Sequence, residues 1–166
     1  FPLIFSTPNF LNTMIPLSMS LIFIFIYLSF NTTNIKSIIS YLAFSQVSII
    51  FYIFCLKEYH AAMFYFITLS LSITMLYLSI GYVVSKFNNI SNVKVMGGII
   101  FKMPSMFLFT LIAFLSTSGV PFFSGFYSHE VIISTFYNSD QAILVPSTLI
   151  GISASFLISY VFLKNI

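Results

Sequence analysis

Long apolar runs separated by short polar stretches follow one another along the 166-residue chain. Most of these runs approach the roughly 20 residues that an α-helix needs to cross the hydrocarbon core of a bilayer. The pattern therefore predicts an all-α, polytopic membrane protein with about five transmembrane helices, one of them broken. The expected segments are Thr13–Phe30, Ile35–Leu56, Ala61–Val84, a run from Pro104 to a break at Gly119, a shorter helix over Gly125–Phe136, and Ile143–Leu163.

The segments between these runs are short and polar. Phe1–Asn12, which holds Pro2 and Pro8, is expected to lie at the membrane interface ahead of the first span. Asn31–Asn34 is expected to supply capping side chains for the next helix. Ser85–Lys102 is the longest polar segment. We expect residues 1–166 to form a single membrane domain.

The fourth apolar run is interrupted at Ser118–Pro121, and a second glycine follows at Gly125. A break inside a span frees backbone groups that lipid cannot satisfy, so it is tolerated where it is buried in protein or lines a wet cavity. His129 and Glu130 stand side by side just beyond it. Because ionisable side chains in such a place are functional candidates, His129 and Glu130 are the candidate proton-pathway residues. The alternative is an ordinary loop between two helices, with both residues at the membrane surface.

The composition excludes most other classes of protein. The chain is 59% hydrophobic and only 5% charged, with a mean hydropathy of +1.07, whereas soluble domains are roughly 25% charged. One cysteine, Cys55, rules out an internal disulfide and a multi-cysteine metal site. We find no motif for a catalytic site, a metal, a cofactor or nucleic acid, and expect none of these.

The few charges predict an orientation. Four lysines fall on one side of the expected bundle and Lys57 on the other; the four are Lys36, Lys86, Lys94 and Lys102. By the positive-inside rule, the loops near Asn34 and Asn92 face the inner compartment.

Heavy use of Phe, Tyr, Ile, Asn and Lys, with no arginine, suggests an A/T-rich genome such as that of an organelle. The chain starts at Phe1 rather than Met, which a non-standard start, processing or a fragment would each explain.

Several short motifs occur in a specific order along the chain. They are NIKSIISYLAFSQVS over Asn34–Ser48, YVVSKFNNISNVKVMGG over Tyr82–Gly98, the FKMP step, and VPFFSGFYSHEVII. On these motifs the chain resembles the antiporter-like membrane subunits of respiratory complex I, NADH:ubiquinone oxidoreductase. It is most similar to subunit 5, and subunits 4 and 2 share the fold.

The resemblance implies a subset of the family fold, so that the chain is one piece of a split subunit or a reduced copy. It implies a membrane-arm subunit in the inner mitochondrial membrane that takes part in proton translocation coupled to NADH:ubiquinone electron transfer. The implied partners are other membrane subunits of complex I, including a chain that supplies the missing helices, and the lipid bilayer. No cofactor of its own is implied.

The chain departs from the family pattern at the positions that matter for proton transfer. The family places two histidines and a central lysine on the span that matches Ala61–Val84; here Tyr65 and Leu69 take the histidine positions and Ile73 takes the lysine position. Where subunit 5 has Ser-Lys-Asp after the break, this chain has Ser128, His129 and Glu130. Histidine titrates nearer neutral pH than lysine, so that end of the pathway is expected to remain able to exchange protons.

Three other functions stay open on this evidence. In the first, the chain is a structural membrane-arm scaffold that keeps the fold and has lost proton conduction. In the second it is a piece similar to subunit 2 or 4, and in the third it is part of a cation/proton antiporter complex. Ile73 favours the scaffold, since an apolar side chain cannot take and give a proton.

Overall fold

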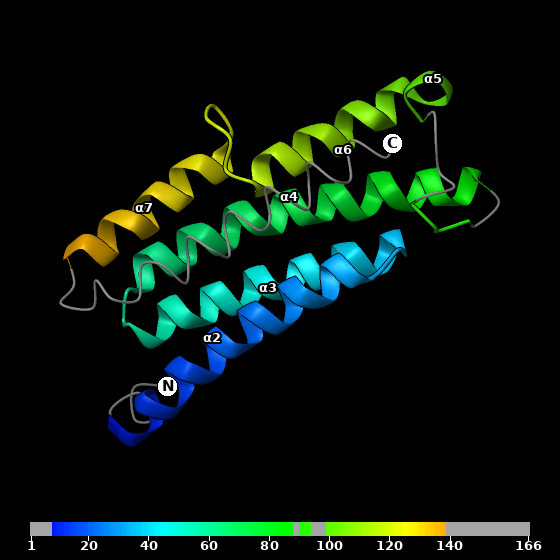
Figure 1. Cartoon of the computed structure of the whole chain (residues 1–166). Coiled ribbons are helices and arrows are strands. Elements are labelled where there is room, and N and C mark those ends of the chain that lie inside the picture. Colours follow the sequence, from blue (N-terminus) through cyan, green and yellow to red (C-terminus); the bar gives the residue numbers. More distant parts are fainter. Residues whose placement is uncertain (1–7, 88–89, 94–98, 139–166) are drawn as a thin grey trace.

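The computed structural model describes residues 8–87, 90–93 and 99–138. The regular structure of these residues is helical, apart from one isolated bridge between two loops. The helices, labelled as in Figure 1, are α2 (Pro8–Asn31), α3 (Ile35–Cys55), α4 (Tyr59–Lys86), the short α5 (Ile99–Lys102), α6 (Pro104–Thr117) and α7 (Ser124–Asn138). The predicted all-α class is confirmed.

α4 is the central helix of the described part. α2 packs on α3, and α3 packs on α4. On its other side α4 contacts both α6 and α7, which follow one another along its length and are joined by a short loop (Figure 1). The broken helix therefore lies against a continuous one.

The lengths of the helices explain why α6 and α7 together lie along the single helix α4. Three helices are long and apolar enough to cross a membrane, over Thr13–Asn31, Ile35–Cys55 and Tyr59–Lys86. At 1.5 Å per residue, α6 and α7 are only about 21 and 22 Å long, less than the roughly 30 Å of a hydrocarbon core. Together they reach about the 42 Å of α4, so the predicted broken helix is one crossing made of two pieces.

Most predicted bounds agree with the structure to within two residues. The exception is the first helix, which begins at Pro8 rather than Thr13. Residues 8–12 of the predicted interface segment Phe1–Asn12 are therefore helical, whereas the candidate membrane span begins at Thr13, as predicted. Residues 1–7 and the predicted span Ile143–Leu163 lie outside the described residues.

The predicted side-chain cap on α3 was also wrong. Asn34 occupies the N-cap position in an extended conformation, but its side chain makes no capping hydrogen bond. The backbone of another loop caps the helix instead: the Ile35 N–H donates to the Ser91 carbonyl at 2.8 Å, and the Val93 N–H donates to the Thr33 carbonyl at 3.0 Å. These bonds form the isolated bridge between Asn34 and Asn92, which holds both loops at one end of the bundle.

Two apolar clusters fill the two halves of the bundle. At the end near the Asn34–Asn92 bridge, α4 contributes Leu76, Ile80, Val83 and Val84. At the other end it contributes Ala61, Ala62, Tyr65 and Leu69. Ser72, the fourteenth of the 28 residues of α4, lies between these two groups along the helix. The helix break, with buried Ser116, Thr117 and Ser118, follows the α6 residues of the first cluster.

We predict that the Asn92 loop and the Glu58 turn lie on opposite sides of the membrane. The bridge joins the Asn34 and Asn92 loops, and each of α3 and α4 then crosses once between that end and Glu58. Single cysteines placed at exposed Ile90 and exposed Glu58 should react with a membrane-impermeant thiol reagent from opposite sides of sealed membranes. The natural Cys55 is buried and replaced by serine for background. Labelling of both sites from the same side contradicts the topology.

Candidate functional site at the helix break

The α6 helix ends in a compact hydrogen-bonded motif. Its C-cap is Ser118, and Gly119 follows with a left-handed φ of 72°. The Val120 N–H donates to the Leu115 carbonyl at 3.1 Å, and the Gly119 N–H donates to the Ser116 carbonyl at 3.2 Å. This is the Schellman pattern, which satisfies carbonyls that the end of a helix leaves free. The protein therefore bonds at least two of the groups that lipid cannot.

A tight turn then leads into α7. Pro121 is its second residue and Phe122 its third, and the Phe123 N–H donates to the Val120 carbonyl at 3.2 Å. Phe122 has a φ of 77°, a left-handed value that a turn of type II requires at its third position and that usually selects glycine. Its side chain is 95% exposed. The turn thus projects an aromatic side chain away from the bundle.

Two glycines allow the two pieces of the broken helix to meet. A Cβ at Gly125 would lie 1.8 Å from the Ser116 carbonyl oxygen, so the start of α7 can approach the end of α6 only without a side chain there. A Cβ at Gly119 would lie 2.3 Å from Nδ1 of His129. The His129 ring therefore occupies the space that the missing side chain of Gly119 leaves.

His129 is buried, with 5% of its surface exposed, and links α7 to α4. Its Nε2 lies 3.3 Å from the hydroxyl of Tyr65, and the two rings are tilted with centroids 5.3 Å apart. The Tyr65 hydroxyl in turn donates to Oε1 of Gln46 on α3. Gln46, Tyr65 and His129 thus form a buried polar chain across three helices.

Most hydroxyls in the spans do not take part in contacts between helices. Ser40, Ser45 and Ser48 on α3 donate to carbonyls three or four residues earlier in the same helix, a bond that satisfies the hydroxyl locally. The exception is a second polar link at the break. Ser72 Oγ lies 2.7 Å from Ser116 Oγ, which lies 3.1 Å from Ser124 Oγ. This link joins α4 to both pieces of the broken helix.

Glu130 does not share the environment of His129. It is exposed on α7, while the neighbouring Ser128 and His129 are buried. Successive residues of a helix point about 100° apart, so adjacency in sequence does not place them on one face. The side chain of His129 contacts Tyr65 on α4 instead.

The three α4 positions that the resemblance matched to the family's two histidines and lysine have distinct environments. Leu69 is 6% exposed and belongs to an apolar cluster, and Ile73 packs against that cluster. Tyr65 has its ring in the same cluster but uses its hydroxyl in the polar chain. Sequence reasoning treated Tyr65 as a lost histidine, and so missed that Tyr65 joins His129 to Gln46.

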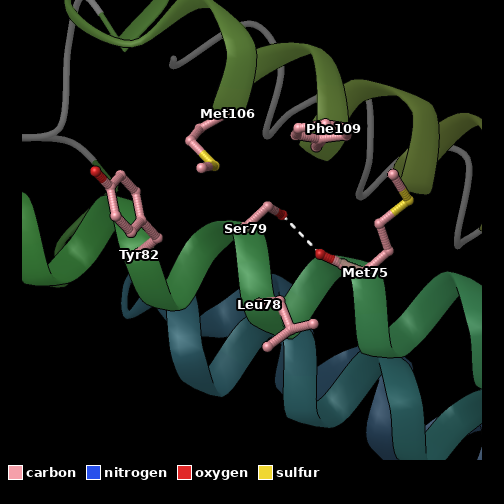
Figure 2. Close-up of a pocket in the computed structure, with 6 residues that line it drawn as sticks. All are labelled: Met75, Leu78, Ser79, Tyr82, Met106 and Phe109. Carbon is pink, nitrogen blue, oxygen red and sulfur yellow. Dashed lines mark hydrogen bonds between the residues drawn. The ribbon is translucent and has the colours of Figure 1, made fainter.

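The described residues offer little for binding a metal or a polar small molecule. Among them no group of three or more His, Cys, Asp and Glu side chains is close enough to hold a metal ion. A pocket of about 330 Å³ lies between α4 and α6 (Figure 2). The Ser79 hydroxyl in its wall is already bonded to the Met75 carbonyl at 2.8 Å. Its lining is mainly apolar: Met75, Leu78, Ser79, Tyr82, Met106 and Phe109.

This combination of features defines a class of protein. Apolar helices of membrane-spanning length pack together, a broken helix lies against one of them, and a buried histidine lies at the break. The described part is therefore a polytopic helical membrane protein of the kind that keeps irregular backbone and ionisable groups inside the bundle.

Comparison with known proteins identifies the family. Residues 1–157 match the model of the NADH:quinone oxidoreductase/Mrp antiporter transmembrane family, and the chain belongs to that family. Similar curated proteins are NADH-ubiquinone oxidoreductase chain 5 of Lycodon semicarinatus, 37% identical over 106 residues, and of Dictyostelium citrinum, 33% identical over 104 residues. These matches cover 64% and 63% of this chain, and 18% and 16% of those relatives.

A third relative extends the match along the chain. Chain 5 of Patiria pectinifera is 30% identical over 138 residues, 80% of this chain. The predicted resemblance to subunit 5 of complex I is thus confirmed. The chain nevertheless spans only 22% of that relative and less than a fifth of the other two.

We predict that Gly125→Ala destabilises the fold by about 1–3 kcal/mol or more, because overpacking forces the backbone to shift. The new methyl group would meet the Ser116 carbonyl. Gly81→Ala is the matched control: nothing lies within 4 Å of its Cβ position inside α4, so it should be neutral or stabilise by about 0.5–1 kcal/mol. The midpoint of thermal denaturation in membranes measures both. Equal midpoints for the two variants would show that the close approach at the break is unimportant.

Proposed function

We propose that this chain is a membrane-arm subunit of mitochondrial complex I, in which it takes part in proton translocation coupled to electron transfer from NADH to ubiquinone. Within it, His129 is the group that exchanges protons. Residues 1–157 match the family of transmembrane subunits, and curated relatives carry the name NADH-ubiquinone oxidoreductase chain 5. The proposal treats residues 1–166 as one membrane domain.

The observation that carries the role of His129 is its position at the break. It is buried within a membrane bundle, packs over Gly119 and is bonded to Tyr65. The imidazole ring of a histidine can take up a proton on one nitrogen and release it again. A buried ionisable group beside a broken helix is the usual location of a proton or ion pathway in a membrane protein.

Glu130 has a separate place in the proposal. It is exposed on α7, one residue beyond His129. From this surface it is positioned to exchange protons with water or with a neighbouring subunit rather than with His129 directly. It is the second proton-pathway residue that we propose.

The proposed surroundings are the inner mitochondrial membrane and the other membrane subunits of complex I. The chain spans less than a fifth of these two relatives, so the proposed function requires further membrane helices beside the ones described here. The exposed apolar surface of the described helices is consistent with contacts to partner subunits and lipid. Only 17% of the Thr13–Asn31 window of α2 is buried, and large apolar side chains such as Tyr27 and Leu78 are exposed. The heavy use of amino acids with A/T-rich codons, such as Phe, Tyr, Ile, Asn and Lys, supports an organelle genome.

A structural scaffold is the second candidate, and a specific observation favours it. Leu69 and Ile73 occupy family relay positions and pack in an apolar cluster. Neither side chain can pass a proton, and their packing closes the direct path along that face of α4. A scaffold would keep the fold and the partner contacts without conducting protons.

We predict that His129→Leu lowers the number of protons pumped per NADH oxidised, while NADH oxidation and assembly are retained. Leucine fills similar space and removes the titratable group. Proton uptake by sealed vesicles that carry the intact complex, measured together with NADH oxidation, tests this. His60→Leu is the matched control, because His60 is exposed at the start of α4 and should leave the ratio unchanged.

The scaffold hypothesis makes a different prediction for the same variant. Unchanged pumping with full assembly would refute the proton role of His129 and leave the scaffold. Loss of assembly in His129→Leu, together with normal assembly in His129→Gln, would assign the residue to packing and hydrogen bonding.

We also predict that the chain is stable only within a larger assembly. Its exposed apolar faces and the projecting turn at Phe122 need lipid or protein neighbours, and α2 buries little of its surface inside the bundle. In mild detergent the chain should migrate with a much larger complex on native gels. A monodisperse monomer that keeps its helix content would contradict this prediction.

A further inference from the structure

The chain of Gln46, Tyr65 and His129 determines which nitrogen of the histidine carries a proton. Oε1 of Gln46 is a carbonyl oxygen and can only accept a hydrogen bond. The hydroxyl of Tyr65 has a single hydrogen, and it is donated to that oxygen. Toward His129 the Tyr65 oxygen therefore presents only lone pairs.

The bond between Tyr65 and His129 then needs its hydrogen from the imidazole ring. Nε2 lies 3.3 Å from the Tyr65 oxygen, so Nε2 is the nitrogen that donates. A neutral imidazole carries one N–H, and its other nitrogen is an acceptor. Nδ1 is consequently the bare nitrogen. It is buried and has no hydrogen-bond partner among the described residues.

The surroundings of Nδ1 connect it to the helix break. A Cβ built on Gly119 would come within 2.3 Å of Nδ1, so this nitrogen faces the backbone at the end of α6. On the opposite side of the ring, Nε2 bonds to Tyr65, and the hydrogen-bonded chain ends at Gln46. The Nε2 of Gln46 also has no partner among the described residues, so no further bond leads out through it.

We propose that Gln46 and Tyr65 are positioning residues that hold His129 in its Nε2–H tautomer, so that Nδ1, beside Gly119, is the one atom through which this ring takes up and releases a proton. A hydronium ion that reaches the break transfers its proton to Nδ1; a new N–H bond forms, water is left, and the ring becomes an imidazolium. The return transfer to water leaves from the same atom. The inference rests on the proposed proton-exchanging role of His129 for its functional meaning.

Release through Nε2 is blocked by the same chain. The Tyr65 oxygen could accept that proton only by passing its own to the Gln46 amide oxygen. A protonated amide is a far stronger acid than an imidazolium, so the transfer does not proceed. Proton exchange therefore takes place at Nδ1 and not at Nε2.

Nuclear magnetic resonance identifies the tautomer directly. The chain is labelled with ¹³C and ¹⁵N only in histidine and kept in its assembly with unlabelled neighbours. The sample is placed in lipid bilayers at a pH well above the ordinary histidine value of about 6.5. Cδ2 is bonded to Nε2 and not to Nδ1, so a carbon–nitrogen correlation shows which nitrogen is protonated. The chain has two histidines, and His60→Gln removes the other signal. We expect a protonated Nε2 and a bare Nδ1 in His129.

A variant separates positioning from packing. In Gln46→Leu the Tyr65 hydroxyl loses its acceptor and should donate to Nε2 instead, which inverts His129 to the Nδ1–H tautomer. Ser45→Ala is the matched control: Ser45 is buried on the same helix but donates to the Leu42 carbonyl at 2.7 Å, so the tautomer should not change. Packing alone would not invert it.

The outcomes decide between the possibilities. An Nδ1–H or doubly protonated His129 in the unmodified chain overturns the proposal, even if Gln46→Leu fails to fold. A Gln46→Leu variant that folds and keeps the Nε2–H tautomer also overturns it. The spectrum does not depend on pumping, so unchanged pumping in His129→Leu would refute the proton role while the tautomer assignment is judged separately.

Discussion

The structure depends on satisfying the backbone where α6 stops inside the membrane. Each unpaired N–H or C=O in hydrocarbon costs several kcal/mol, so a break survives only if protein supplies the partners. Here Gly119 takes the left-handed conformation that closes the end of α6, and Gly125 lets α7 start against the Ser116 carbonyl. The same missing side chain at Gly119 makes room for the His129 ring. The backbone requirement and the position of the histidine are therefore one constraint.

Two polar links between helices stand out among the described residues. One runs from Gln46 to His129, and the other from Ser72 to Ser116 and Ser124. Both use α4, and Ser72 lies at the middle of that helix, between the residues that α4 contributes to the two apolar clusters. Serines such as Ser45 and Ser48 donate instead to carbonyls of their own helix. Polar side chains that link helices are thus placed where the broken helix needs them.

The lengths of the helices could be predicted from the sequence, because the thickness of the bilayer sets how long an apolar run a spanning helix needs. The break followed from Gly119 and Pro121 for a similar local reason. What each side chain faces could not be predicted, because these helices are apolar around most of their circumference and carry no strong periodic signal. For that reason the sequence drew attention to Glu130 beside His129 but not to Tyr65, which lies 64 residues away in sequence and contacts the His129 ring.

The replacement at position 65 changes what the site can do. A histidine there, as in the family pattern, could hold a proton at neutral pH and pass it on. A tyrosine has an ordinary pKa of about 10 and can share a hydrogen bond without becoming charged. With Leu69 and Ile73 apolar and Gln46 at the end of the chain, α4 offers His129 a fixed partner and no further carrier. In the proposed pathway, a proton that His129 exchanges therefore travels along the break and the surface of α7, where Glu130 is exposed, and not along α4.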